Sequence, residues 1–456
     1  MNIDIFRGKK VALLGFGIEN ISVAKFLLKN DIDFSVLDKA PLEKIIEEGQ
    51  SLIKEKNLDL ISGDDYLSGL GDFDIIVRSP GIPYLSEEIQ AAKLNGVTVT
   101  SSTKLFFDFC PADIIGVTGT KGKGTTTSLI YEIIKKSGKK VYLVGNIGTP
   151  SFNVIESIKA EDLIVFELSS FQIQDLDKSP HISVLVNLDV DHLDYHKSLE
   201  EYQETKAAIF KNQTAEDFAV LNNDYPDSKR MEDIGQAKKY LFSSKEKVQN
   251  GAYVNPEGDV ILAISGHEKV CSESEVQLIG RHNLENIAAS SIVGKILSID
   301  TSIISEAIKS FKGLEHRTEF VREINGVKYF NDSFSTNPVP TIAAIKSFIT
   351  PVTLIVGGSE KGANFSSMAG EIKKSSVKNI IFIGVEGPRI KKSVEEVGTA
   401  AQLIDGDQDI SLVVKKAKEV TESGGVVLFS PACASFDMFK NYKDRGNKFK
   451  DAVNNL

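Results

Sequence analysis

The chain has 456 residues, of which 41% are hydrophobic and 25% charged, and its formal net charge is −10. This length exceeds what a single hydrophobic core normally holds, so we expect several domains. The acidic balance argues against a nucleic-acid-binding protein, which normally has a basic face, but allows local positive pockets that bind small anions.

Cysteine spacing and apolar runs indicate the compartment. Cys110, Cys271 and Cys433 lie far apart without metal-ligand spacing, as expected of a protein kept in a reducing compartment. No apolar run approaches a membrane span, and the N-terminal residues run directly into a strand pattern. We therefore expect a cytoplasmic protein without membrane insertion.

The first block, residues 1–102, alternates strand and helix patterns, which is typical of a parallel sheet with crossover helices. Its first strand ends in the turn GFGIEN, with Asn20 where a dinucleotide fingerprint has its third glycine. Asp38 follows at the end of the second strand, where a ribose-binding carboxylate would stand. This pattern is compatible with NAD(P), with another nucleotide, or with a tight turn that only opens a helix.

The second block, residues 103–313, begins with a phosphate-type loop, GVTGTKGKGTTTS at 116–128. The glycines and the following helix would offer backbone N–H groups to a phosphate, and Lys123 would reach the terminal phosphates. Gly124 follows Lys123 where the usual loop has a hydroxyl residue, so Thr125 is the first hydroxyl available to magnesium. A flexible Gly/Thr loop is the alternative.

Polar residues follow the next strands of this block, at the edge where ligands of parallel sheets collect. Glu167 ends one strand and would suit Mg²⁺ or its water, although an ordinary strand-terminal acid is the alternative. His192 lies among three aspartates, which favours a metal or phosphate neighbourhood. Lys206 lies on an amphipathic helix beyond it, where a solvated lysine is the alternative.

The remaining patterns complete a three-domain α/β chain. Residues 242–275 are polar and turn-rich and indicate a small β excursion, and 280–297 returns to a helical pattern. The third block, 314–456, repeats the strand-to-helix alternation. We predict a Rossmann-like domain over 1–102, a central P-loop ATPase-like domain with a parallel sheet over 103–313, and a Rossmann-like C-terminal domain over 314–456.

These motifs together resemble the Mur ligase family of ATP-dependent amide-forming enzymes, whose own phosphate loop reads G-T/S-x-G-K-x-T. The matching segments occur in family order and cover nearly the whole chain: GTKGKGTT, GNIGTP, ELSSFQ, NLDVDHLDYH, YQETKAAIF, GRHNLEN, GLEHRTEF, NDSFSTNP, GGSEKG and SPACASFDMFKNYKDRGNKF. Three positions depart from the common pattern. Lys121 replaces an asparagine, Gly124 a hydroxyl residue, and Phe334 the lysine of NDSKATN.

The resemblance implies ATP as a substrate, two Mg²⁺ ions and a carbamylated Lys206. A carbamate would supply anionic oxygens where a free ammonium would repel magnesium. The implied catalytic residues are Lys123, Glu167, His192 and Lys206, and the implied metal ligands are Thr125, Glu167, His192 and Lys206. The implied nucleotide-binding residues are Gly119, Thr120, Gly122, Lys123, Gly124, Thr125, Thr126, Asn283, Asn286, Arg317 and Asp332.

Among family members, the segments VALLGFG, SPGIP and SPACASFD are most similar to the branch that adds D-glutamate to UDP-N-acetylmuramoyl-L-alanine in peptidoglycan precursor synthesis. For the UDP-sugar, this implies contacts with Ile18, Asp38, Gly81, Asn146, Ser169 and His192. For glutamate, it implies Thr336, Lys361, Ser435, Phe436 and Tyr442. With Phe334 in place of a lysine, Lys361 would carry more of the carboxylate recognition.

We expect the protein to act on small-molecule substrates, to bind no nucleic acid and to be a monomer. Three alternatives stay open at this point: a sister ligase that adds another amino acid, a catalytically silent nucleotide-binding regulator, and a dehydrogenase. A silent regulator would be expected to lack Lys123, Glu167, His192 or Lys206, and the chain contains all of them.

Overall fold

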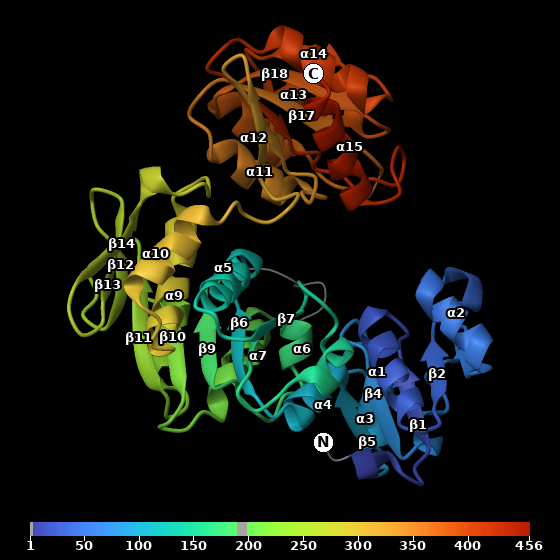
Figure 1. Cartoon of the computed structure of the whole chain (residues 1–456). Coiled ribbons are helices and arrows are strands. Elements are labelled where there is room, and N and C mark those ends of the chain that lie inside the picture. Colours follow the sequence, from blue (N-terminus) through green and yellow to red (C-terminus); the bar gives the residue numbers. More distant parts are fainter. Residues whose placement is uncertain (1–2, 189–197, 361) are drawn as a thin grey trace. The chain divides into compact units, whose positions relative to one another are not determined.

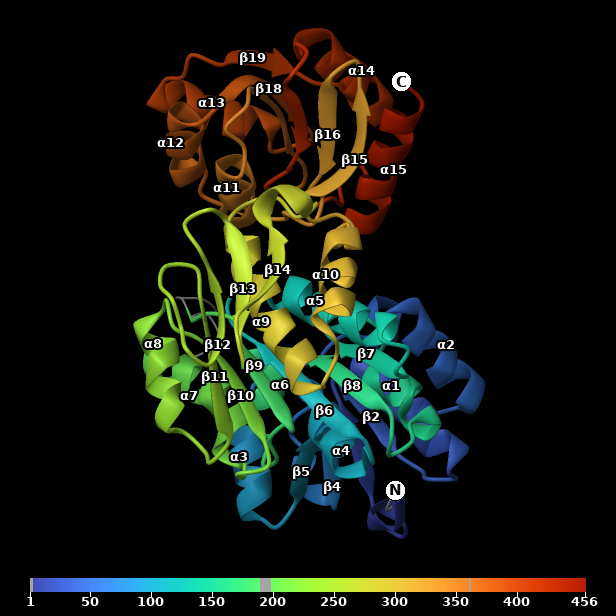
Figure 2. The same cartoon turned by 60° about the vertical axis from the view of Figure 1, so that its left-hand side comes forward.

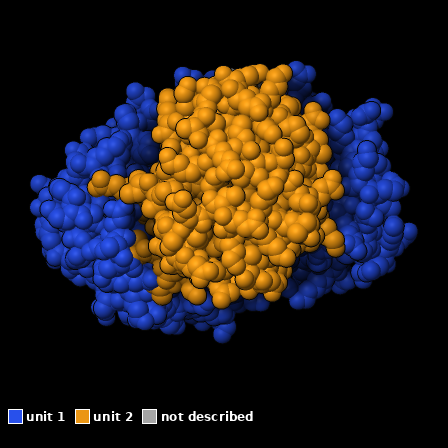
Figure 3. Space-filling model, turned by 90° about the horizontal axis from the view of Figure 1, so that it is seen from above, with its two compact units in different colours: residues 1–275, 284–309 blue, residues 276–283, 310–456 orange. Residues whose placement is uncertain are grey.

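The computed structural model describes residues 3–188, 198–360 and 362–456. It divides into two compact units, which are coloured separately in Figure 3. The first unit contains Met1–Glu275 and Leu284–Lys309, and the second contains Val276–Asn283 and Ser310–Leu456. Each unit is described by itself.

The first unit begins with a five-stranded, wholly parallel sheet in the order β3-β2-β1-β4-β5 (Figure 1). β1 and β4 are buried along their whole length, which explains the apolar runs VALL in β1 and IIV in β4. The strands are β1 (Val11–Leu14), β2 (Ser35–Asp38), β3 (Asp59–Ser62), β4 (Ile75–Arg78) and β5 (Thr98–Ser101). The helices are α1 (Ile18–Lys29), α2 (Glu47–Lys56), α3 (Glu87–Leu94) and α4 (Ser102–Phe109).

A nine-stranded sheet follows in the same unit, in the order β14-β13-β12-β11-β10-β9-β6-β8-β7. Its strands are β6 (Asp113–Thr118), β7 (Val141–Gly145), β8 (Leu163–Glu167), β9 (Ile182–Leu185), β10 (Phe218–Asn222), β11 (Lys238–Ser243), β12 (Gly251–Val254), β13 (Asp259–Ala263) and β14 (Glu268–Ser272). Its helices are α5 (Lys123–Lys136), α6 (Ser170–Ile173), α7 (Leu199–Lys211), α8 (Pro226–Lys229), α9 (His282–Ile296) and α10 (Thr301–Ser310). The predicted β excursion is confirmed, because β12, β13 and β14 form an antiparallel extension of this sheet (Figure 2).

The two sheets of the first unit share one hydrophobic core. Phe26 of α1 packs against Phe109 of α4 and against Phe152, with ring centroids 6.2 Å and 5.2 Å apart. The same cluster continues to Phe166 in β8. This shared core explains why the first two predicted domains form a single compact unit, and the boundaries at residues 102 and 313 stay predictions.

The second unit contains a six-stranded sheet in the order β15-β16-β20-β17-β18-β19, parallel except for the β15–β16 hairpin. Its strands are β15 (Glu319–Ile324), β16 (Val327–Asn331), β17 (Val352–Gly357), β18 (Val377–Ile383), β19 (Gln402–Asp405) and β20 (Val426–Phe429). Its helices are α11 (Pro338–Lys346), α12 (Ser366–Lys374), α13 (Gly387–Val397), α14 (Ile410–Val420) and α15 (Tyr442–Asn454). Buried clusters on both faces of the sheet supply its core.

The predicted α/β class with parallel sheets is confirmed. Within the described ranges, no helix combines the length and the apolar character that crossing a membrane requires.

Candidate functional site

Glycine shapes the loop between β6 and α5 where the helix begins. Gly122 caps α5 with a φ of 78°, in the left-handed region. A Cβ atom on Gly122 would lie 2.4 Å from Oδ1 of Asn286, so only glycine fits without rearrangement. The first N–H groups of a helix have no intrahelical acceptor, which makes this end of α5 suitable for a phosphate.

Asn187 holds the other side of this loop. Its Oδ1 accepts hydrogen bonds from the backbone N–H groups of Thr120 (3.2 Å) and Lys121 (2.8 Å), and its Nδ2 donates to the Lys121 carbonyl. Two of the loop amides therefore bond within the protein. The phosphate contacts predicted for this loop stay predictions.

Two lysine side chains meet at the Gly119 carbonyl. Nζ of Lys123 donates to it at 3.0 Å, and Nζ of Lys206 donates to it at 3.0 Å as well. Lys206 also donates to Oγ1 of Thr118, and its Nζ lies 4.7 Å from the centre of the Tyr202 ring. Its side chain is 1% exposed, so the alternative of a solvated surface lysine is wrong.

A cavity of about 300 Å³ lies in front of these lysines. It is lined by Pro80, Lys123, Asn146, Ser169, Ser170, Phe171, Tyr202 and Lys206. The cavity thus brings together four predicted site residues that are far apart in sequence. Glu167 is 5% exposed at the end of β8, and its carbonyl accepts a hydrogen bond from the Asn146 N–H, which places it beside the cavity wall.

The N-terminal glycine turn is fixed by two side chains. The Asp38 carboxylate accepts hydrogen bonds from the N–H groups of Phe16 (2.6 Å) and Ala40 (2.7 Å). Nδ2 of Asn20 donates to the carbonyls of Leu14, Gly15 and Val77, and so joins the ends of β1 and β4. One carboxylate oxygen of Asp38 therefore fixes the glycine turn and the other fixes the chain after β2, which favours a role in positioning over the ribose contact of an NAD(P) site.

Asp332 is buried in the second unit at the end of β16. Its Oδ1 accepts from the Thr318 N–H at 3.0 Å, and its Oδ2 accepts from the hydroxyls of Ser335 and Ser430. Burial raises the pKa of this carboxyl to about 6. Asp332 therefore joins three loops of the second unit, and its predicted nucleotide contact stays a prediction.

Phe334, which stands where the common family pattern has a lysine, contacts an arginine and a tyrosine. The Arg317 guanidinium carbon lies 3.9 Å from the centre of the Phe334 ring, and the Tyr442 ring meets Phe334 edge-on at 4.9 Å. Phe334 and two predicted site residues, Arg317 and Tyr442, thus form one cluster. An aromatic face in place of a lysine removes a positive charge beside Arg317 and supplies a surface on which the guanidinium can stack.

A second cavity, of about 260 Å³, lies in the second unit. It is lined by Thr336, Asn337, Ser359, Ala363, Phe365, Glu386, Ala432 and Cys433. Of the residues predicted for glutamate, Thr336 lines this cavity, Ser435 is buried beyond Cys433, and Phe436 is 70% exposed.

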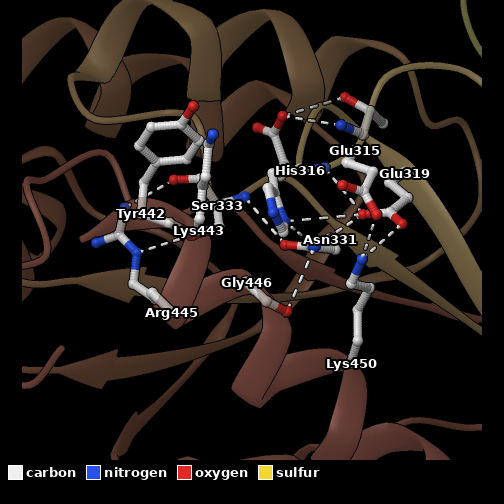
Figure 4. A network of polar contacts seen from close by, with 12 residues as sticks. Glu315, His316, Glu319, Asn331, Ser333, Tyr442, Lys443, Arg445, Gly446 and Lys450 are labelled. Carbon is white, nitrogen blue, oxygen red and sulfur yellow. Dashed lines mark hydrogen bonds and ion pairs between the residues drawn. The ribbon is translucent and has the colours of Figure 1, made fainter. Parts of the chain in front are cut away.

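Arg445 of α15 holds the loops behind this cavity (Figure 4). It is fully buried and donates from Nη1 to the carbonyls of Cys433 and Ala434, both at 3.0 Å. Its Nη2 and Nε donate to the carbonyl and hydroxyl of Ser333. Burial lowers the pKa of the guanidinium to about 10. Next to it, the His316 ring contacts Nδ2 of Asn331, and burial lowers the pKa of this histidine.

Three domain models of one family match the chain in order. They are described as Mur ligase MurD-like, N-terminal domain (residues 9–101), Mur ligase middle domain (117–294) and Mur ligase, glutamate ligase domain (316–433). The chain belongs to the Mur ligase family.

Curated relatives of this Mur ligase cover almost all of its length. The protein named UDP-N-acetylmuramoylalanine--D-glutamate ligase from Clostridium kluyveri is 42% identical, with 100% of this chain and 99% of the relative covered. Its namesake from Clostridium botulinum is 40% identical over 99% of this chain and 98% of the relative.

Similarity to solved structures supports the fold but no finer property, because the sequence identities are low. UDP-N-acetylmuramate-alanine ligase MurC from Thermotoga maritima aligns with a TM-score of 0.60 at 17% identity, covering 98% of this chain and 99% of that one. MurF ligase from Thermotoga maritima in complex with ADP aligns with a TM-score of 0.58 at 17% identity, covering 98% and 95%.

Several predicted residues of the Mur ligase site stay predictions. His192 and Lys361 lie outside the described residues. Within the described ranges, no group of three or more His, Cys, Asp or Glu side chains is arranged to hold a metal. Asn283 and Asn286 both lie in the first turns of α9, where Nδ2 of Asn283 donates to the Ile279 carbonyl and Oδ1 of Asn286 accepts from the Thr126 hydroxyl.

Sequence reasoning missed the residues that support this site. Asn187, Arg78 and Arg445 each bind a backbone group that is distant in sequence, at Lys121, Phe171 and Ser333 respectively. The one available signal was their position within matching segments, since Asn187 opens NLDVDHLDYH and Arg445 lies in the C-terminal segment.

Proposed function

We propose that the chain is an ATP-dependent ligase that adds D-glutamate to UDP-N-acetylmuramoyl-L-alanine during peptidoglycan precursor synthesis. The observation that carries this proposal is the 40–42% identity to proteins named for that reaction, over 99–100% of the chain. The phosphate loop with Lys123, and the buried Lys206 in the same cavity, supply a chemical reason for the assignment.

The proposed reaction has two steps. A carboxylate oxygen of the UDP-sugar substrate attacks the γ-phosphorus of ATP, the bond to the bridging oxygen breaks, and ADP leaves. The glutamate amine then attacks the carbonyl carbon of the acyl phosphate, phosphate leaves, and the nitrogen gives up a proton to form the amide. Lys123, fixed by the Gly119 and Thr120 carbonyls, would stabilise charge on the transferring phosphoryl group.

The donor set fits magnesium and a carbamylated lysine. Glu167 offers carboxylate oxygens and Thr125 a hydroxyl, the hard ligands that Mg²⁺ prefers. Lys206 is buried in the cavity wall, where an ammonium would repel a divalent cation and a carbamate would attract it. We propose that these residues, with His192, hold two Mg²⁺ ions, which would neutralise phosphate charge when bound.

For glutamate, the cavity of the second unit is the proposed binding region. Thr336 lies in its wall, and Cys433 belongs to the loop whose carbonyls Arg445 holds. Lys361 and Tyr442 are proposed to complete recognition of the carboxylates. The stack of Arg317 on Phe334 would direct the guanidinium toward the nucleotide.

The test is a substrate panel. With ATP, Mg²⁺ and UDP-N-acetylmuramoyl-L-alanine, phosphate should be released when D-glutamate is added, and far less with L-glutamate, D-aspartate, L-lysine, diaminopimelate or L-alanine. Mass spectrometry should detect the glutamyl product. Turnover with another amino acid and none with either glutamate would favour a sister ligase. ATP binding without turnover in any combination would favour a catalytically silent regulator.

A further inference from the structure

Arg78 is a fully buried charged residue to which the proposed reaction gives no role. It is the last residue of β4 and is 0% exposed. Charged side chains are almost never buried to this degree unless they are paired. Its partner is Asp175, 2% exposed, at 3.3 Å from Nη2, and Asp175 also accepts a hydrogen bond from the Ser101 hydroxyl.

The Arg78 guanidinium fixes the turn that follows β4. Nη1 donates to the Ile82 carbonyl at 2.7 Å and makes longer contacts of 3.4 Å to the carbonyls of Ser79 and Pro80. The turn is closed by the Ile82 N–H, which donates to the Ser79 carbonyl. One side chain therefore binds the carbonyls of nearly the whole 79–82 turn.

The same guanidinium fixes the start of α6. Nη2 donates to the Phe171 carbonyl at 3.2 Å. Pro80 and Phe171 both line the 300 Å³ cavity of the first unit, whereas Arg78 itself does not. Arg78 therefore links two segments that carry cavity walls, and a guanidinium presents its donors in a rigid planar fork that sets the distance between such segments.

We propose that Arg78 is a positioning residue for the UDP-sugar substrate, because it fixes the 79–82 turn against Phe171. The inference rests on the proposed function, since Gly81 and Ser169 are predicted to bind this substrate and lie in or beside these two segments. Arg78 acts through backbone carbonyls and touches no reacting atom.

Arg78→Lys tests this role. Lysine keeps a positive charge near Asp175, but one ammonium cannot replace a fork that binds Ile82, Phe171 and Asp175 together. We expect the KM for UDP-N-acetylmuramoyl-L-alanine to rise about 10- to 100-fold, as for small misplacements of binding groups. The KM for ATP should stay within about twofold, because the Lys123 loop has its own support in Asn187.

Lys104→Met is the matched control. Lys104, on α4, pairs with Asp177 and Asp108, so it joins neighbouring segments of the same unit without contacting a wall of the cavity. This variant should leave both KM values unchanged. If Arg78→Lys fails to fold, Asp175→Asn loosens the same guanidinium and should raise the same KM by a smaller factor.

Amide hydrogen exchange without ligand gives a second readout that is independent of catalysis. In Arg78→Lys, residues 79–84 and 170–174 should lose protection together, and in Lys104→Met they should not. Unchanged protection, an unchanged KM for the UDP-sugar, or an equal rise in both KM values would overturn the role of Arg78. Absence of turnover by the wild-type enzyme would instead count against the proposed function, and the exchange result would still decide on Arg78.

Discussion

The two compact units hold their candidate site residues in different ways. In the first unit, Lys123 and Lys206 line the cavity with their own charged side chains. In the second unit, Arg445 and Asp332 are buried behind the cavity and bind the loops that form it. Substitutions of these two lysines should therefore act mainly on rate, whereas substitutions of Arg445 and Asp332 should change stability and binding together.

Lys206→Ala should have the largest effect. Removing this buried lysine removes the group proposed to carry the carbamate, and we expect turnover to fall by roughly 10³ or more. A small carboxylic acid such as acetate at high concentration should restore part of the rate. Lys211→Ala, at the exposed end of the same helix, is the control and should be fully active. Near-normal turnover of Lys206→Ala without additive would contradict the carbamate proposal.

Lys123→Ala should reduce kcat by about 10²–10³, because the lost charge acts on the transferring phosphoryl group. Calorimetry should show weaker ATP binding and unchanged affinity for the UDP-sugar. Lys121→Ala, in the same loop but exposed, should change the rate little. Equal weakening of ATP binding and UDP-sugar binding would mean that the loop had rearranged. Lys123 would then affect structure, as Arg445 is expected to do in the second unit.

Arg445→Met should mainly destabilise the second unit. It removes the donor of the buried carbonyls of Cys433 and Ser333, and each buried unsatisfied group costs about 1–3 kcal/mol. The Ala434 carbonyl keeps the hydrogen bond that it accepts from the Ser359 N–H. We expect the free energy of unfolding to fall by about 3 kcal/mol and the KM for glutamate to rise. Denaturant unfolding measures the first effect, and exposed Lys443→Met on the same helix serves as the control. An unchanged unfolding curve together with a lower kcat would mean that Arg445 acts on the rate and not on the stability of the second unit.

Residues proposed to face ligands and residues that support them differ in how much could be predicted from the sequence. Residues that face ligands sit in short motifs whose chemistry is visible locally, such as Lys123 in its glycine loop, and the α/β alternation predicted the sheets. The supports could not be predicted, because Arg78 meets Phe171 and Arg445 meets Ser333 only after folding. The hydrogen bonds that Asp38 accepts from backbone N–H groups, and those that Asp332 accepts from Thr318, Ser335 and Ser430, had no local signal either.

Asp332 should make the stability of the second unit depend on pH. Its folded pKa, about 6, lies above the ordinary value of 3.8, so the folded state binds this proton more tightly. The resulting stabilisation is present below about pH 4 and is lost as the pH rises through 6, about 3 kcal/mol in total. Between pH 4 and pH 7 the unfolding free energy of the wild type should fall by about 3 kcal/mol more than that of Asp332→Asn, because the other titrating groups are the same in both proteins. Parallel curves would mean that Asp332 does not titrate in this range.

The smallest effect is expected at Phe334, where the second unit departs from the common Mur ligase pattern. Its ring supports the Arg317 guanidinium at 3.9 Å, and a cation–π contact at an exposed site is worth about 0.5–1 kcal/mol. Phe334→Lys removes this contact and adds a like charge, so the KM for ATP should rise about two- to fivefold. Phe334→Tyr keeps an aromatic face and should behave as wild type. Because Phe334 is 37% exposed, Phe334→Lys should lower the unfolding free energy by only about 1 kcal/mol, and Phe334→Tyr should change it by less than about 0.5 kcal/mol. If Phe334→Lys instead lowered the KM for glutamate, the lysine of the common pattern would be the better ligand, and Phe334 would mark a weakened glutamate site rather than a support for Arg317.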